Sequence, residues 1–160
     1  MKRRHTYNVQ IQWTGAGEKG TQTYVSYLRD FVVRSGGKPE LPGSSDPSFR
    51  GDPLRYNPEE LLVASLSSCH LLWYLHLCAV NHVTVVGYDD PAIGLMEEDE
   101  SGSGLFSSVV LRPTVRILHG SSEEKAMALH HDAHRYCFIA RSVNFPVSIE
   151  ASVQTVPSPE

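Results

Sequence analysis

Residues 57–70 read NPEELLVASLSSCH. This stretch predicts the first half of a long helix, with a cysteine at position 69. Asn57 can serve as the N-cap, and Pro58 suits the first helical turn. Glu60 stands three residues after Asn57, which is the spacing of a capping box. We therefore expect a well-defined helix to begin at Pro58.

The helix continues through a run without formal charge, from Leu61 to Val80. That run is roughly as long as a bilayer is thick, so it has to be weighed as a membrane span. Serines and histidines interrupt it, and no basic flank would orient it. We favour a buried helix in a soluble protein or at a subunit interface. It should end near residues 81–82, because the β-branched residues 83–86 favour a strand.

The segments around this helix predict an α+β fold in a single domain over residues 1–160. Alternation and β-branched residues predict the following strands: 7–13, 21–27 and 30–34 before the helix, and 83–86, 91–96, 106–118 and 147–153 after it. Residues 35–57 predict a long irregular connection, and Pro113 suggests an edge position or a bulge. Ser121 and Glu124 have capping-box spacing and predict a second helix.

Composition excludes several functional classes. The 160 residues are 41% hydrophobic and 20% charged, as in an ordinary soluble domain. A net charge of −4 argues against a nucleic-acid partner. No secretory segment is visible, so we expect a cytoplasmic protein without a membrane partner. Three cysteines do not make a disulfide framework, and a disulfide in a reducing compartment is more often catalytic than structural.

Two cysteines stand in distinctive settings: Cys69 in the first helix, and Cys137 at the end of the second. Cys78 we expect to be an ordinary core residue. Three interpretations of the pair stay open: peroxide chemistry, a metal site, or burial of both thiols in the core. For the metal site, His130 and His134 share a helical face with Cys137, but no fourth ligand at compact spacing is evident. Without a fourth ligand, the simpler interpretation is that these histidines lie on a partly solvated face of the helix.

Activation of Cys69 poses a geometric difficulty. A reactive cysteine needs a thiolate, yet Cys69 lies about three turns inside the helix, beyond the reach of the N-terminal dipole. Glu59 is about 15 Å away along the axis and roughly 80° around it. Either the helix breaks between the two residues or a second subunit supplies the partner. An arginine from elsewhere would also have to stabilise the thiolate.

The sequence resembles the family of osmotically inducible and organic hydroperoxide resistance proteins, the OsmC/Ohr family. The resemblance covers nearly the whole chain. It is strongest in residues 57–62 (NPEELL) with Cys69, and in Cys137 followed by residues 142–147 (SVNFPV). It implies an OsmC-like intertwined homodimer, in which long central helices are wrapped by antiparallel β-sheets and the active sites lie at the subunit interface.

The resemblance also implies an activity and its residues. It implies a thiol-dependent peroxidase that reduces organic hydroperoxides, with Cys69 as the peroxidatic cysteine, Cys137 as the resolving cysteine and Glu59 as the active-site glutamate. The family carries an arginine in its first hairpin, where this chain has Glu18-Lys19-Gly20. The candidates to replace it are Arg29 and Arg50.

The expected partners follow from this chemistry: an organic hydroperoxide, a thiol or dithiol reductant, and a second copy of the chain. No metal, flavin or haem cofactor is required. Trp73 and nearby leucines would favour an alkyl or aryl peroxide, although Trp73 can also be simple core packing. The alternative function is a non-enzymatic small-ligand-binding or redox-sensing protein that uses the same interface pocket. The absence of a hairpin arginine favours that alternative.

Overall fold

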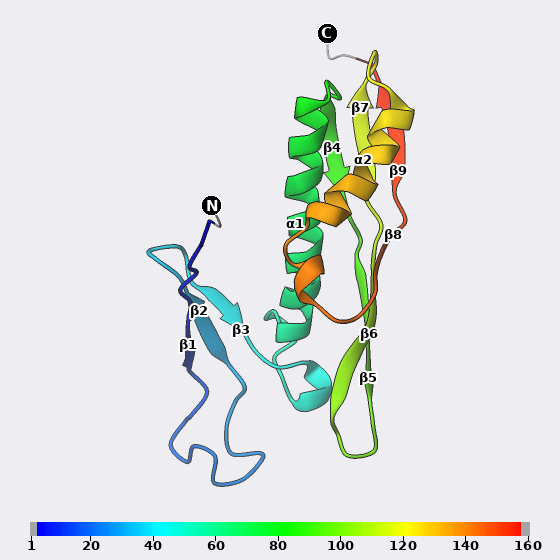
Figure 1. Ribbon diagram of the computed structural model, residues 1–160. Coiled ribbons are helices and arrows are strands. Elements are labelled where there is room, and N and C mark those ends of the chain that lie inside the picture. Colours follow the sequence, from blue (N-terminus) through cyan, green and yellow to red (C-terminus); the bar gives the residue numbers. More distant parts are fainter. Residues whose placement is uncertain (1–2, 158–160) are drawn as a thin grey trace. The chain divides into compact units, whose positions relative to one another are not determined.

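The structure is a computed structural model that describes residues 3–157 (Figure 1). Its described residues group into two compact units, Met1–Leu61 and Leu62–Glu160. Each unit is described separately below. The single domain predicted over residues 1–160 stays a prediction, and residues 1–2 and 158–160 lie outside the described residues.

The first unit contains a three-stranded antiparallel sheet of β1 (Gln10–Trp13), β2 (Phe31–Arg34) and β3 (Leu41–Gly43), in that order. The predicted strands near residues 7–13 and 30–34 are confirmed in part of their length. The stretch predicted to be irregular also holds the short β3 and the 3-10 helix η1 (Pro47–Phe49).

The prediction that residues 21–27 form the hairpin partner of β1 is wrong. These residues are turns and bends, and β1 pairs with β2 instead. Local hydrogen bonds occupy the segment: the Ser26 hydroxyl accepts from the Thr23 amide at 3.0 Å and donates to the Gly20 carbonyl at 2.7 Å. Backbone groups satisfied in this way have less to gain from a sheet.

The long helix α1 (Pro58–Val80) begins and ends close to the predicted residues. Its capping box is confirmed: the Glu60 amide donates to Asn57 Oδ1 at 2.7 Å, and the Asn57 amide donates to the Glu60 carboxylate at 3.1 Å. At the other end, the Asn81 side-chain amide donates to the Leu77 carbonyl at 2.9 Å. Both ends of α1 are therefore capped by the side chains that flank it.

The second unit contains two three-stranded sheets, in the orders β4-β7-β9 and β5-β6-β8. Their strands are β4 (Val85–Asp89), β5 (Ile93–Glu98), β6 (Gly104–Leu111), β7 (Thr114–Leu118), β8 (Val147–Ile149) and β9 (Ser152–Val156). The pairs β4–β7 and β5–β6 are antiparallel, whereas β8 and β9 run parallel to β6 and β7. Each of these two sheets is therefore mixed.

Two predicted strands are each divided in two. Pro113 ends β6 rather than forming a bulge or an edge position, because it has no amide hydrogen to continue the ladder. The predicted strand 147–153 divides opposite it, into β8 and β9. Backbone bonds bridge the break: the Glu150 amide donates to the Leu111 carbonyl and the Ser152 amide to the Pro113 carbonyl, both at 2.8 Å.

The second helix, α2 (Glu123–Tyr136), begins one residue later than a cap at Ser121 would place it. Ser122 is the N-cap, and its side chain accepts from the Lys125 amide at 3.2 Å. The Ser121 hydroxyl instead accepts from the amide of Thr84 at 3.0 Å, just before β4. The capping-box prediction therefore found the helix but assigned the wrong serine.

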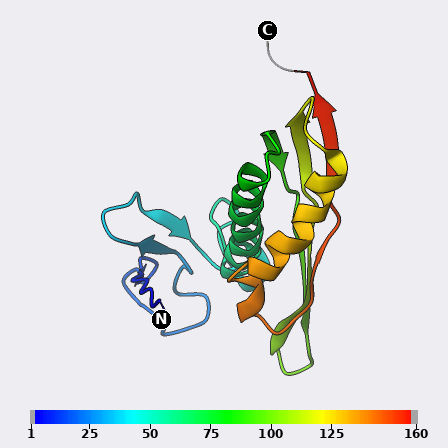
Figure 2. The same ribbon diagram turned by 45° about the horizontal axis from the view of Figure 1, so that its top comes forward.

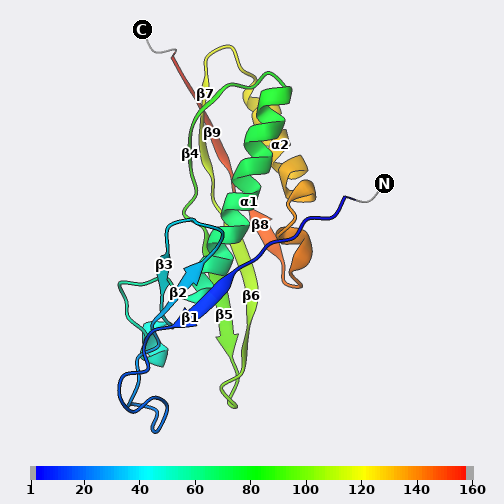
Figure 3. The same ribbon diagram turned by 90° about the vertical axis from the view of Figure 1, so that its left-hand side faces the viewer.

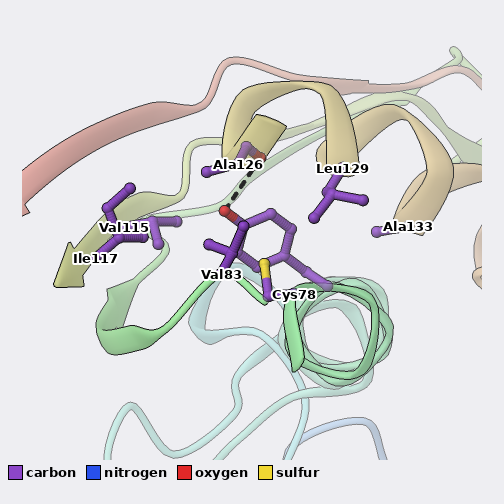
Figure 4. Packing of buried hydrophobic residues seen from close by; sticks show 8 residues of the cluster. Cys78, Val83, Val115, Ile117, Ala126, Leu129 and Ala133 are labelled. Atoms are coloured by element: carbon purple, nitrogen blue, oxygen red, sulfur yellow. Dashed lines mark hydrogen bonds between the residues drawn. The ribbon is translucent and has the colours of Figure 1, made fainter. Parts of the chain in front are cut away.

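Both helices lie on the same side of the strands in the second unit, next to each other (Figures 2 and 3). Their core residues come from α1 (Tyr74, Cys78), from Val83, from β7 (Val115, Ile117) and from α2 (Ala126, Leu129, Ala133). The Tyr74 hydroxyl donates to the Ala126 carbonyl at 3.2 Å, the dashed bond in Figure 4. The predicted core position of Cys78 is confirmed.

Candidate active site

The structure brings Cys69 and Cys137 together. Cys69 lies half-buried on α1, and Cys137 follows α2 as its C-cap with 1% of its surface exposed. Burial, and secondly a side-chain hydrogen bond with Cys69, raise the pKa of Cys137 to about 11. The Ala140 amide, which donates to Cys137 Sγ at 3.4 Å, opposes this shift. Both cysteines are free thiols, and Cys69 is close enough to Cys137 to raise its pKa.

This arrangement makes the two thiols unequal. A thiol whose pKa is raised to about 11 keeps its proton at neutral pH, so Cys137 is the protonated, unreactive form at rest. Cys69 is the partner that solvent can reach, because it is only half-buried. A reactive thiol needs access, and a resolving thiol needs only to be adjacent. The geometry thus suits attack by Cys69 and capture by Cys137.

An aromatic cluster lies beside the thiols. Trp73, one helical turn after Cys69, stacks on Tyr136 with ring centroids 5.2 Å apart and meets the edge of Phe138 at 5.5 Å. Tyr136 and Phe138 flank Cys137 in sequence. A pocket of about 270 Å³ is lined by Leu72, Trp73 and His76. Trp73 both packs against the core of the second unit and lines this pocket.

Sequence reasoning missed a buried histidine pair between α1 and α2. His70 Nε2 lies 3.0 Å from His130 Nδ1, and the two rings stack. His130 also stacks on Tyr74, with ring centroids 3.9 Å apart. The expectation that His130 belongs to a solvated face is wrong, because only 4% of its surface is exposed. The spacing of Leu66, His70, Tyr74 and Cys78 at every fourth position was the available signal.

Burial keeps both histidines uncharged. It lowers the pKa of His70 to about 4, against a smaller opposing effect of Asp90, and the charge of His134 adds to the lowering. Burial and then the charge of His70 lower the pKa of His130 to about 3. Because each imidazole is neutral, the pair shares one proton in its mutual hydrogen bond.

This pair predicts a loss of stability in acid. The unfolded chain protonates these histidines below about pH 6.5, whereas the folded chain protonates them only near pH 4 and pH 3. The unfolded state therefore binds more protons in this window. We expect the free energy of unfolding to fall between pH 7 and pH 5 by up to about 2 kcal/mol per histidine.

Denaturant titrations at pH 7, 6 and 5 measure this loss. A His130→Asn variant should reduce the dependence on pH, and the exposed His119→Asn control should retain it. If the free energy of unfolding depends on pH equally in the wild type and in the His130→Asn variant, the pKa values of the two histidines are not lowered in the folded protein.

The proposed activating residues belong to the first unit, whereas Cys69 and Cys137 belong to the second. Glu59 is in the first turn of α1, and its Oε2 is buried with no hydrogen-bond partner among the described residues. Because α1 is continuous from Pro58 to Val80, a helix break between Glu59 and Cys69 is excluded. Of the two solutions expected from sequence, only a second subunit stays open.

The two candidate arginines differ in their surroundings. The Arg29 guanidinium lies over the rings of Tyr24 and Tyr27, 4.4 and 4.2 Å from their centroids, and donates to both of their carbonyls. Arg50 is exposed and ends η1 in the left-handed conformation, with φ 67°. Sequence reasoning overlooked Arg55, which pairs with Asp30 at 3.5 Å and with Asp52 at 3.3 Å.

A metal site is not formed by the described residues. They contain no group of three or more His, Cys, Asp or Glu side chains placed to hold a metal ion. In particular, His130 directs Nδ1 to His70, and the Cys137 thiol contacts Cys69. The metal interpretation of His130, His134 and Cys137 therefore fails on geometry.

Comparisons with known proteins agree with the fold and the motifs. A family model described as OsmC-like protein matches residues 51–152. The chain belongs to the OsmC family. An OsmC-like protein of unknown function from Vibrio cholerae is 31% identical, with a TM-score of 0.81 over 93% of this chain and 100% of the other. The α+β fold is therefore that of OsmC proteins.

More distant members share this fold. An organic hydroperoxide resistance protein from Elizabethkingia anophelis is 19% identical, with a TM-score of 0.68 over 98% of this chain and 100% of its own. One from Legionella pneumophila is 18% identical, with a TM-score of 0.65 over 96% and 99%. No curated protein matches the sequence.

Family membership bears on the membrane question. By length and composition, α1 is long and apolar enough to cross a bilayer, the one such helix among residues 3–157. OsmC proteins are generally soluble. Four side chains of α1 are buried, although only 22% of its apolar window is buried among the described residues. The buried-helix interpretation is therefore favoured.

Proposed function

We propose that this OsmC protein is a thiol-dependent peroxidase that reduces organic hydroperoxides through Cys69. The observation that carries the proposal is the proximity of a partly buried Cys69 to a buried Cys137 whose pKa is raised. The family includes organic hydroperoxide resistance proteins, which supports a role in peroxide resistance.

The cycle has three balanced steps. In the first step, the Cys69 thiolate attacks the terminal oxygen of ROOH. An S–O bond forms as the O–O bond breaks, which gives the Cys69 sulfenic acid. The departing RO⁻ takes up a proton and becomes ROH. The Cys137 sulfur then attacks the Cys69 sulfenic acid, which forms the disulfide and releases water. Two external thiols, or one dithiol, reduce the disulfide and leave as a disulfide themselves. No metal, flavin or haem takes part, and the thiol pool of the cytoplasm would supply the reductant.

The aromatic cluster supports an organic rather than an inorganic peroxide. Trp73, Tyr136 and Phe138 pack their rings together, and Phe138 is 65% exposed. Burial of an alkyl or aryl group against these rings gains roughly 25 cal/mol for each Å² removed from water. Hydrogen peroxide has no such group, so the cluster favours alkyl and aryl hydroperoxides.

A homodimer completes the proposed site. One face of α1 is buried in its own unit, but Leu72 is 67% exposed and Val80 58% exposed on the rest of the helix. A second copy of the chain would cover this apolar surface. It would also supply Glu59, whose Oε2 is buried without a partner among residues 3–157. An arginine, Arg29 or Arg50, would pair with Glu59 and polarise the peroxide.

Replacing Cys137 with serine is expected to separate the two halves of the cycle. The first turnover should remain, because Cys69 still attacks the peroxide. Its sulfenic acid should then persist, since serine cannot form the disulfide. Trapping with dimedone should label Cys69 in this variant and give little label in the wild type, where Cys137 competes.

A Cys78→Ala variant is the matched control, because it removes a thiol that lies in the core. Dimedone should label it as little as the wild type. Absence of label on Cys69 in the Cys137→Ser variant after treatment with cumene hydroperoxide would contradict the proposal. It would favour a protein that binds small ligands in the same pocket without reacting.

A further inference from the structure

The turn after Cys137 places a backbone amide against the sulfur of that residue. The amide of Ala140, the first residue of the 3-10 helix η2 (Ala140–Ser142), donates to Cys137 Sγ at 3.4 Å. Only 1% of the surface of Cys137 is exposed, so water competes little for this hydrogen bond. No charged side chain among residues 3–157 hydrogen-bonds to this sulfur. Apart from the nearby Cys69 thiol, the polar environment of Cys137 Sγ is therefore the main chain.

Hydrogen bonds hold this turn in one conformation. The Arg141 amide donates to the Cys137 carbonyl at 3.1 Å, and the Ser142 amide donates to the Ile139 carbonyl at 2.9 Å. The Ser142 hydroxyl adds a bond to the Phe138 carbonyl at 2.7 Å. The amide that faces the sulfur is therefore fixed in direction before any reaction takes place.

Packing anchors the turn to the helix that carries Cys69. The side chains of Ile139 and Ala140 lie against a buried cluster formed by Leu66 of α1 and by Val109 and Leu111 of β6. Leu66 stands three residues before Cys69 on the same helix. The amide donor and the thiol that is to be resolved are thus held by one core.

Attack by Cys137 on an oxidised Cys69 changes the charge on the Cys137 sulfur. The S–H bond of Cys137 and the S–O bond of the sulfenic acid break, the S–S bond forms, and the proton leaves with the hydroxyl group as water. Negative charge develops on Cys137 Sγ as its proton departs. Burial, and secondly Cys69, raise the pKa of this thiol to about 11, whereas the amides of Ala140 and Ile139 act to lower it.

A donor that already points at the atom where charge develops stabilises that charge without reorganisation. We propose that the Ala140 amide is a catalytic group of the resolving step, because it stabilises the anionic sulfur of Cys137 while that sulfur attacks Cys69. The inference rests on the proposed function for the oxidant that modifies Cys69. The attack itself is the same for any leaving group on the Cys69 sulfur, so it can be measured without a peroxide.

The test replaces the amide by an ester in the full-length chain. Residues 137–160 begin with a cysteine, so a synthetic peptide of this segment can be joined to a recombinant thioester of residues 1–136 by native chemical ligation. Lactic acid in place of Ala140 retains the methyl side chain and removes the N–H that faces the sulfur. The matched control has an ester in place of the Arg141 amide, which bonds to the Cys137 carbonyl in the same turn.

The measured reaction begins from a mixed disulfide. Dithiobis(nitrobenzoate) should modify Cys69, because Cys78 and Cys137 are buried. Attack by Cys137 then forms the Cys69–Cys137 disulfide and releases the coloured nitrothiobenzoate. The ester at position 140 should slow this release by at least about tenfold, the loss expected for a hydrogen bond to a charged group. The ester at position 141 should leave the rate close to that of the wild-type chain.

Selenocysteine in place of Cys137 separates the chemistry of the amide from its structural role. A selenol is already ionised at neutral pH, so its attack does not depend on a group that stabilises the anion as it forms. The ester at position 140 should therefore slow the selenocysteine protein much less than the cysteine protein. If both proteins are slowed equally, the amide only maintains the shape of the turn and the inference is wrong.

Failure of this inference is distinguishable from failure of the peroxidase proposal. If the ester at position 140 slows the release but cumene hydroperoxide leaves Cys69 unoxidised, the role of the amide stands and the peroxidase function fails. If the peroxide oxidises Cys69 but the ester and wild-type chains release nitrothiobenzoate at the same rate, the function stands and the role of the amide is refuted.

Discussion

Replacing Cys69 with serine is expected to slow the consumption of an organic hydroperoxide by at least about 10³-fold, because the nucleophile of the first step is lost. Serine is close in size to cysteine, and residue 69 is only half-buried, so the fold should persist. The measurement is the rate of cumene hydroperoxide loss with dithiothreitol as reductant, with wild type and variant at equal concentration.

Two sets of control variants accompany the Cys69→Ser measurement. Cys78→Ala removes the core thiol and should retain wild-type rates once its folding has been checked by circular dichroism. Arg29→Lys and Arg50→Lys, compared with each other, show which arginine serves the site, since lysine keeps the charge but not the planar fork. A Cys69→Ser protein as active as the wild type would refute the assignment of Cys69.

Mixed dimers of two inactive variants are expected to regain activity. If Glu59 serves the Cys69 of the other subunit, a dimer of one Cys69→Ser chain and one Glu59→Gln chain contains one intact site. Each variant alone should be severely impaired, Glu59→Gln by about 10²-fold. Random assembly from equal amounts should restore about a quarter of the wild-type activity, because half of the dimers are mixed and each has one working site of two.

The experiment co-expresses the two variants with different affinity tags, so that mixed dimers can be purified apart from the parents. Purified mixed dimers should reach about half of the wild-type rate per dimer. Co-expression of Cys69→Ser with Cys137→Ser is the matched control, because the contacting thiols belong to one chain. Purified mixed dimers that stay inactive would mean that Glu59 does not act on the Cys69 of the other subunit. Failure to recover any mixed dimer would mean that the chain does not form the proposed dimer.

Helix signals in the sequence were strong enough to predict both helices. The capping box of Asn57 and Glu60 forms as expected, since it depends only on residues three apart. The start of α2 was likewise predictable to within one residue, because its capping signal is local. The α+β class and the OsmC family were accessible for the same reason: they rest on continuous stretches of sequence.

Strand pairing was harder to predict, because it depends on distant residues. Residues 21–27 have strand-like composition, but the bonds of Ser26 to Thr23 and Gly20 hold turns there. The break at Pro113 divides one predicted strand between two sheets, and the partners that carry the pairing past it come from residues 150 and 152. No periodicity in either stretch predicts such a distant partner.

The candidate site was predictable only in part. The two cysteines could be named from their motifs, and the structure adds their proximity and the burial that raises the pKa of Cys137. The aromatic cluster and the His70–His130 pair each join a residue of α1 to a residue of α2 or just after it. The joined residues lie about 60 positions apart in the sequence. Such contacts exist only once the two helices pack against each other.

The most direct test of the central claim is a disulfide map after treatment of the fully reduced protein with one equivalent of cumene hydroperoxide. Mass spectrometry of the unreduced digest should show one peptide pair linked through Cys69 and Cys137, while Cys78 stays a free thiol. The Cys69→Ser protein should show no linked pair. If the wild type keeps all three thiols, or links Cys78 instead, the two cysteines are not a peroxidatic and resolving pair.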